Sequence, residues 1–173
     1  MSSARTPFRY CPYCQAELTD QSIHGRTRRA CLACGFVHFE DPKLGAAVLV
    51  EDRGQVLLVR RAVDPAWGAW CLPSGFVECD EHPAQAAARE CWEETGLQVE
   101  VTDLLGVDCF ADDARGPGVV IFYRARVTGG TLQAGDDASE VRFFSPQQLP
   151  DQIAFASNRR VLAEWRRGKS RSG

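Results

Sequence analysis

Runs of apolar residues divide much of the chain into short extended segments. Residues 44–50 and 55–60 are largely apolar and flank Asp52-Arg53-Gly54, a combination typical of two strands joined by a turn. Gly129-Gly130 marks another turn. Further segments have the same strand-like character: 97–107, 119–127 and 141–144. The segments between them, 62–74 and 112–118, contain Gly and Pro and predict loops, the second of them mobile.

Two other segments have helical periodicity. Apolar or small residues recur through 83–95 at the spacing of one helix face: Ala84, Ala87, Ala88, Cys91 and Thr95. Pro83 suits a first helical position and Gly96 a left-handed C-terminal cap. Residues 157–166 place Val161, Leu162 and Trp165 on one face, and residues 146–149 predict a helical turn. Strands combined with two helices favour an α/β/α sandwich with a mixed sheet.

Three carboxylates lie close together on the first predicted helix. Glu90, Glu93 and Glu94 stand at i, i+3 and i+4, so they share one stripe. Like charges at this spacing destabilise an isolated helix by about 0.2–0.5 kcal/mol per pair. A divalent cation such as Mg²⁺ removes the conflict, because it prefers carboxylate oxygen and bridges to phosphates. The alternative interpretation is a solvated acidic helix face.

The residues around this stripe form a longer signature, Gly75-x5-Glu81-x7-Arg89-Glu90-U-x-Glu93-Glu94-x-Gly96-U, with U apolar. It resembles the box of the Nudix hydrolases at every defining position. The resemblance implies an α/β/α sandwich and Mg²⁺- or Mn²⁺-dependent hydrolysis of a nucleoside diphosphate linked to another moiety. It implies that Glu90, Glu93 and Glu94 bind the metal, joined by the Gly75 carbonyl. The residues matching Glu81 and Arg89 would fix the loop–helix–loop, which completes the catalytic set within the box.

Two Cys-x2-Cys pairs, Cys11/Cys14 and Cys31/Cys34, predict a second metal site near the N-terminus. Four thiolates complete a tetrahedron around Zn²⁺ and leave no position for water, so this site is expected to be structural. So short a segment cannot build a sufficient core, whereas structural zinc contributes about 10–16 kcal/mol of apparent binding free energy. A redox dithiol pair or two disulfides are the alternatives. The layout resembles a zinc ribbon.

Residues outside these two motifs complete the candidate site. Glu140, in Glu140-Val141-Arg142-Phe143, resembles the segment where NADH pyrophosphatases keep a third metal-binding Glu; a strand-edge surface position is the alternative. Trp70, Phe76 and Phe110 are candidates to stack on a base of the substrate, with core packing as the alternative for each.

Composition narrows the setting. With 173 residues and 45% apolar residues, the chain suits one domain with a small appendage. We expect a zinc ribbon at 1–40, the Nudix-like domain at 41–167 and a disordered tail at 168–173. No apolar run reaches the roughly 18 residues of a membrane span, and the N-terminus lacks a secretory signal, so a cytoplasmic protein is expected. The net charge of −3 does not favour nucleic acid as a partner, although Arg26, Arg28 and Arg29 form a small basic cluster.

The order of these features resembles the zinc-ribbon branch of Nudix pyrophosphatases. That branch includes enzymes acting on FAD, ADP-ribose and NADH, so we expect FAD or ADP-ribose as substrate, with AMP and a second phosphate as products. The Ser-Gln-Pro-Trp run of NADH pyrophosphatases is absent from residues 98–123. The alternatives are an enzyme acting on NADH or NAD-capped RNA, and a non-catalytic regulator that senses a nucleotide. Related enzymes also suggest a homodimer.

Overall fold

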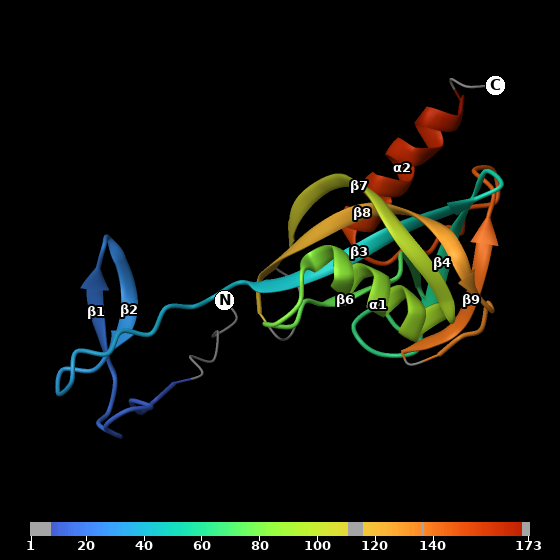
Figure 1. Cartoon of the computed structure of the whole chain (residues 1–173). Helices are drawn as coiled ribbons and strands as arrows, with labels where there is room; N and C mark the ends of the chain where they lie inside the picture. Colours follow the sequence, from blue (N-terminus) through green and yellow to red (C-terminus); the bar gives the residue numbers. More distant parts are fainter. Residues whose placement is uncertain (1–7, 111–115, 136, 171–173) are drawn as a thin grey trace. The chain divides into compact units, whose positions relative to one another are not determined.

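The computed structural model describes residues 8–110, 116–135 and 137–170 (Figure 1). Its contacts divide the chain into two compact units, Met1–Asp41 and Pro42–Gly173. The boundary falls between Asp41 and Pro42. None of the helices among the described residues is long and apolar enough to cross a membrane.

The N-terminal unit is built around a small hairpin of β1 (Thr19–Ile23) and β2 (Arg26–Ala30). The two residues between the strands, His24 and Gly25, both have positive φ, as the tight turn of a two-residue hairpin requires. The buried centre is very small: Cys11, Leu18 and Cys31 are buried, with Ala16 and Phe36 packed against them. A unit with so few buried apolar side chains needs another source of stability.

The C-terminal unit contains a mixed sheet in which β3 (Lys43–Asp52) is central. β3 pairs in parallel with β8 (Gly118–Gly130), which pairs antiparallel with β7 (Leu97–Phe110). On its other side β3 pairs with β4 (Gln55–Arg61), followed by β5 (Trp70–Cys71). Two further strands complete the sheet: β6 (Ser74–Phe76) pairs with β3, and β9 (Ala138–Phe144) pairs with β4.

The buried run of β3 supplies both faces of this sheet. Ala46, Val48 and Val50 join a hydrophobic cluster with α1 (Pro83–Thr95), whereas Ala47 and Leu49 join a second cluster with α2 (Ala156–Ser170). Successive side chains of a strand point to opposite faces, so a continuous apolar run implies layers on both sides. Figure 1 shows α1 in green against the sheet and α2 in red, apart from α1. The expected α/β/α sandwich is confirmed.

Local capping fixes the two ends of α1. The His82 side chain accepts a hydrogen bond from the Ala84 amide, and the Gln85 side chain accepts one from the His82 amide, which together form a capping box. Pro83 takes the first helical position. Gly96 ends the helix with φ of 69°, so the predicted left-handed cap is present.

Several boundaries differ from the sequence prediction. The expected loop at 62–74 contains β5 and part of β6, because short strands carry too little periodicity to be recognised. The expected helical turn at 146–149 is a hydrogen-bonded turn closed by the Gln148 amide on the Ser145 carbonyl. Helix α2 continues through Ser170, so expecting disorder from residue 168 was wrong for 168–170. The mobile loop expected at 112–118 falls largely outside the described residues, as do residues 171–173.

Candidate active site and metal centre

The acidic stripe of α1 faces strand β6. Gly75, in the middle of β6, pairs with Ala46 of β3 and lies directly under the Glu90 side chain. A Cβ built on Gly75 would stand 2.0 Å from the Glu90 carboxyl carbon, a distance that no real side chain tolerates. Glycine is therefore required here by the close approach of a carboxylate, and not by its backbone freedom.

Arg89 ties the first part of the box together. Its guanidinium donates to both carboxylate oxygens of Glu81, at 3.1 and 2.6 Å, and to the Phe76 carbonyl at 3.0 Å. The same group donates to Glu90 and Glu93, each at 2.8 Å. The Arg89 bonds lower the pKa of Glu81, helped by the Glu78 amide, which donates to the same carboxylate at 2.9 Å. These bonds join the loop before α1, the helix and β6 into one unit.

Glu94 is the buried member of the stripe, with 6% of its surface exposed. Its carboxylate accepts a hydrogen bond from the Ser74 amide at 3.0 Å. Burial raises the pKa of Glu94 to about 8, opposed by the Ser74 amide and reinforced by the charge of Glu90. Burying the ionised form of such a carboxylate costs free energy unless a cation lies beside it.

These carboxylates fit a hard divalent cation. The donor set is all oxygen, it carries several negative charges, and the glycine at position 75 leaves its space to the Glu90 carboxylate. Within the described residues, however, the oxygens of the three glutamates do not all lie within 4.8 Å of one another. Arg89 holds Glu90 and Glu93, while Glu94 turns to Ser74.

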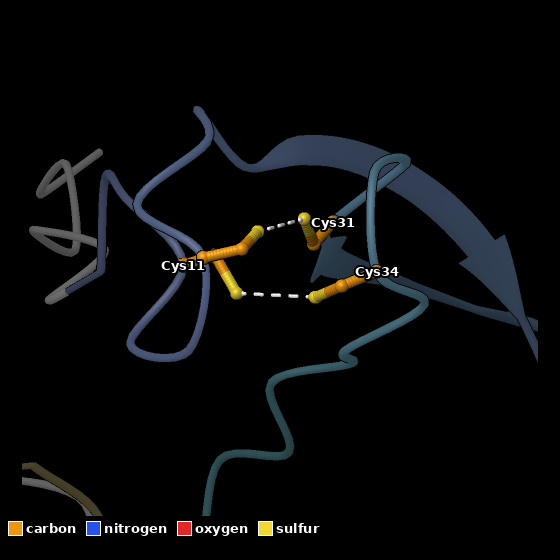
Figure 2. Close-up of side chains that lie close together, drawn as sticks. Cys11, Cys31 and Cys34 are labelled. Atoms are coloured by element: carbon orange, nitrogen blue, oxygen red, sulfur yellow. Dashed lines mark hydrogen bonds between the residues drawn. The ribbon is translucent and has the colours of Figure 1, made fainter.

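The four N-terminal cysteines do converge. Their sulfur atoms all lie within 4.8 Å of one another, with Cys11 and Cys34 at 3.5 Å and Cys14 and Cys31 at 3.4 Å (Figure 2). A tetrahedron with bonds of about 2.3 Å places its sulfurs roughly 3.8 Å apart, so the cluster fits Zn²⁺. The paired sulfurs are too far apart for a disulfide, whose S–S length is about 2.05 Å. All four cysteines are free.

Comparison with known proteins agrees with this geometry. A family model described as the NUDIX domain matches residues 41–165. The chain belongs to the Nudix family. It is a Nudix hydrolase.

Three proteins illustrate what this Nudix hydrolase is similar to. An ADP-ribose pyrophosphatase of Methanocaldococcus jannaschii is 39% identical over 75% of this chain and 76% of its own. The NAD-capped RNA hydrolase NudC of Vibrio atlanticus is 26% identical over 90% of this chain and 56% of its own. The crystal structure of a NUDIX hydrolase from Nitrosomonas europaea superposes with a TM-score of 0.84 and 30% identity, covering 95% of this chain and 93% of that one.

The structure does not bring Glu140 to the acidic stripe. Glu140 pairs with Arg60 across β9 and β4, and its carboxylate lies 3.6 Å from the Arg60 guanidinium. Residues paired across antiparallel strands share a face, and Arg60 shares the face of Leu58, which packs on the α2 side of the sheet. Glu140 is therefore on the sheet face opposite α1, which does not support the predicted ligand role.

Asp137 is the acidic residue that the sequence reasoning missed. It lies just before β9, and its charge raises the pKa of Glu94, after the larger effects of burial and of Glu90. Its carbonyl accepts a hydrogen bond from the Ala62 amide at 2.7 Å, while the Gly135 amide donates to the Glu94 carbonyl at 3.1 Å. A loop residue has no periodicity to mark it, so the only signal was an acid shortly before a strand.

The three aromatic candidates lie in different surroundings. Trp70 packs edge-on against Phe144, with the ring centroids 4.9 Å apart, as a core residue does. Phe110 lies over Gly118, where an added Cβ would meet its ring. Phe76 lines a hollow of about 370 Å³ with Lys43 and Glu78, on the strand that contacts the acidic stripe. Of the three, Phe76 has the surroundings that best suit a substrate contact.

Proposed function

We propose that this Nudix hydrolase cleaves the diphosphate bond of ADP-ribose or FAD. The products are AMP and the other half of the substrate, which keeps the second phosphate group. The observation that carries the proposal is the α1–β6 contact, where Glu90 and Glu94 are held against Gly75 and Ser74. The similarity to an ADP-ribose pyrophosphatase over most of both chains supports this substrate class.

The box residues take separate parts in this reaction. Glu90, Glu93, Glu94 and the Gly75 carbonyl would hold Mg²⁺ or Mn²⁺, and Asp137 offers a carboxylate from outside the box. The bound cation would polarise the diphosphate and lower the pKa of the attacking water. Arg89 and Glu81 keep the helix in register with β6, so that the carboxylates stay fixed when charge develops on the phosphates.

The four cysteines would hold a structural Zn²⁺ in the N-terminal unit. All the donors are thiolates and every position of the tetrahedron is filled, so the ion would support the fold of this unit without taking part in hydrolysis. A homodimer and a cytoplasmic location stay predictions. A monomer mass measured by light scattering would refute the predicted homodimer.

A substrate panel tests the proposal. Purified full-length protein is incubated with Mg²⁺ or Mn²⁺ and each of ADP-ribose, FAD, NADH, diadenosine tetraphosphate and NAD-capped RNA, and products are separated by chromatography. We expect AMP from ADP-ribose and FAD at much higher kcat/KM than from the other compounds. No product from any of them with either metal would overturn the proposal.

One observation favours a second candidate. The similarity to an NAD-capped RNA hydrolase extends over 90% of this chain and so covers more of it than the family model. An activity on NADH or on NAD-capped RNA therefore remains the alternative. Release from these two substrates, with ADP-ribose turned over slowly, would replace the first proposal by the second.

A further inference from the structure

Buried polar side chains are few among the described residues, and they occur in two pairs. One pair, Glu94 and Thr95, lies at the end of α1, and the other, Ser157 and Asn158, lies in the first turn of α2. A buried amide group costs free energy unless it makes a hydrogen bond. Asn158 is only 4% exposed, so its partner inside the protein indicates why a polar residue is kept there.

Asn158 reaches from α2 to the strand segment beside the acidic stripe. Its Oδ1 accepts a hydrogen bond from the Leu72 amide at 2.8 Å. Two residues further along the chain, the Ser74 amide donates to the Glu94 carboxylate at 3.0 Å. Gly75, whose carbonyl belongs to the expected metal ligands, comes next. One short stretch of backbone is therefore bonded both to α2 and to the buried carboxylate of α1.

The backbone changes its neighbouring strand at residues 72–73. β5 pairs with β4, whereas β6 pairs with β3. In the described residues, β3 and β4 pair with each other only beside their turn, at Glu51–Val56 and Asp52–Gln55. The chain therefore leaves one strand and joins the other at Leu72, where the regular ladder of hydrogen bonds is interrupted. Asn158 supplies an acceptor at this point.

The contacts around this crossing differ in what they depend on. The Trp70 amide donates to the Gln152 carbonyl at 2.9 Å, and the Ala154 amide donates to the Trp70 carbonyl at 2.8 Å. Both contacts join backbone groups, so they do not depend on which side chains are present. The contact of the Leu72 amide is made by a side chain, and the identity of residue 158 therefore controls it.

We propose that Asn158 is a positioning residue of the divalent-metal site. Its side chain fixes the backbone at Leu72, and thereby holds the Ser74 amide and the Gly75 carbonyl in place against the carboxylates of α1. This inference rests on the proposed function, because it takes those carboxylates as metal ligands. The competing explanation is that Asn158 only fastens α2 to the sheet.

Mg²⁺ makes the position of its ligands critical. It requires oxygen atoms in a nearly ideal octahedron at about 2.0–2.1 Å, so a small displacement of a carbonyl or carboxylate weakens binding. Loss of a residue that orients metal ligands costs about 10- to 100-fold in metal affinity. A side chain that only fastens a helix affects the stability of the fold, and not the affinity for the metal.

Mn²⁺ binding without substrate tests the role directly. Electron paramagnetic resonance measures free Mn²⁺ in the presence of full-length protein, and Glu94→Gln identifies the ions held by the carboxylates. Leucine is close to asparagine in size but cannot accept the Leu72 bond, so Asn158→Leu should weaken Mn²⁺ binding about tenfold or more. Ser157→Ala, which alters the buried neighbour in the same turn, is the matched control and should bind Mn²⁺ like the wild type.

Asn158→Asp separates metal binding from stability. Aspartate keeps an acceptor oxygen for the Leu72 amide, so Mn²⁺ binding should be largely restored, although the buried charge lowers the melting temperature. If Asn158→Asp loses Mn²⁺ binding as completely as Asn158→Leu, the hydrogen bond does not position the site and the proposed role is wrong. Should Asn158→Leu not fold, Asn158→Ala removes the same acceptor without adding bulk.

Kinetics with ADP-ribose give a second measurement. In Asn158→Leu the Mg²⁺ concentration for half-maximal activity should rise about tenfold or more, while kcat at saturating Mg²⁺ stays close to the wild-type value. A lower melting temperature with unchanged Mg²⁺ dependence would identify Asn158 as a fastening of α2 only.

The inference and the proposed function fail in different ways. If the wild type hydrolyses the substrate panel and Asn158→Leu binds Mn²⁺ as tightly as the wild type, the positioning role is wrong and the proposed function stands. Weaker Mn²⁺ binding by Asn158→Leu, in a protein whose wild type hydrolyses none of the substrates, supports the positioning role and overturns the proposed function. A wild type that neither binds Mn²⁺ through Glu94 nor hydrolyses any substrate overturns both.

Discussion

The N-terminal unit and the α1–β6 region each present a candidate metal site, but they assemble it differently. In the N-terminal unit each pair of cysteines lies in its own backbone turn, and the two turns are alike: the Cys11 amide donates to the Ala16 carbonyl and the Cys31 amide to the Phe36 carbonyl. In the α1–β6 region Arg89 of the same helix donates to Glu90 and Glu93, whereas Glu94 accepts a hydrogen bond from the Ser74 amide of β6. Each Cys-x2-Cys motif forms its own backbone turn, so its half of the metal site depends on local structure. A stripe of carboxylates on a helix forms a site only where another part of the fold packs against it.

The two units also differ in what stabilises them. The N-terminal unit buries a handful of apolar side chains, whereas the sheet of the C-terminal unit has a hydrophobic cluster on each face. Zinc bound by four thiolates would therefore supply most of the stability of the first unit. Divalent metal at the carboxylates would matter for activity far more than for folding.

The largest effect should come from Cys31→Ser. Loss of one of four thiolates removes most of the roughly 10–16 kcal/mol that structural zinc contributes, so the N-terminal unit should unfold. Zinc content measured by mass spectrometry should fall, and residues 8–41 should become sensitive to protease while 42–170 stay protected. Cys109→Ser, an exposed cysteine outside the cluster, is the control. A protected N-terminal unit in zinc-free Cys31→Ser would contradict the comparison.

Glu94→Gln should abolish most activity while the fold persists. The change removes the charge of the buried carboxylate and keeps its shape, so kcat should fall about 10²-fold or more, the scale of losing an electrostatic contact in a transition state. Glu140→Gln is the control, because Glu140 lies on the opposite face of the sheet. An equal fall in kcat for both variants, measured with saturating substrate and Mg²⁺, would make Glu140 a candidate active-site residue again.

Gly75→Ala sharpens the role of the tertiary surface. The new methyl group would overlap the Glu90 carboxylate, so Glu90 must move or β6 must shift. Overpacking of this kind costs about 1–3 kcal/mol of the free energy of unfolding, and a higher Mg²⁺ concentration should be needed for half-maximal activity. Urea unfolding and a Mg²⁺ titration measure the two. Gly106→Ala, where an added Cβ meets nothing within 4 Å, should change neither.

The smallest effect concerns the two cysteine turns. Gln15 and Gly35 hold equivalent positions: the Gln15 amide donates to the Cys11 carbonyl and the Gly35 amide to the Cys31 carbonyl, and their φ angles are 62° and 78°. Gly35→Gln should destabilise the zinc-loaded unit by about 1–2 kcal/mol, the cost of a left-handed residue. Gln15→Gly should change stability by less than about 1 kcal/mol, because relieved strain is offset by greater freedom of the unfolded chain. Equal losses from both, seen by thermal unfolding, would show that the turns are not equivalent.

The sequence predicted much of the fold from periodicity and punctuation. The long strands β3, β4 and β8 and helix α1 were identified because they are apolar or periodic, and because Gly or Pro marks turns or caps beside them, as with Gly54 between β3 and β4 and Gly96 after α1. The hairpin of β1 and β2 was missed because Thr19–Ile23 and Arg26–Ala30 are polar strands of a small unit, with few apolar residues to mark a buried face.

The candidate site was predicted unevenly for the same reason. The box and the four cysteines were recognised from the sequence, because each motif is defined by particular residue types at fixed spacing. Glu140 was selected because its segment resembles the one where NADH pyrophosphatases keep a third metal-binding Glu, whereas it is Asp137, in the loop before that strand, whose charge contributes to the raised pKa of Glu94. Sequence reasoning could not tell that, of the two arginines at the end of β4, Arg61 lies near Glu94 while Arg60 pairs with Glu140. The face of the sheet to which a side chain points depends on strand register.

By itself the sequence determined the chemistry of this protein: an oxygen-rich acidic helix, four thiolates in two local turns, and membership of the Nudix family. These follow from short-range spacing, which a helix or a tight turn converts directly into geometry. Only the tertiary structure decided which carboxylate is buried, why residue 75 must be glycine and which arginine stands beside the site. Those outcomes depend on segments distant in sequence meeting across a sheet, and spacing along the chain carries no record of that packing.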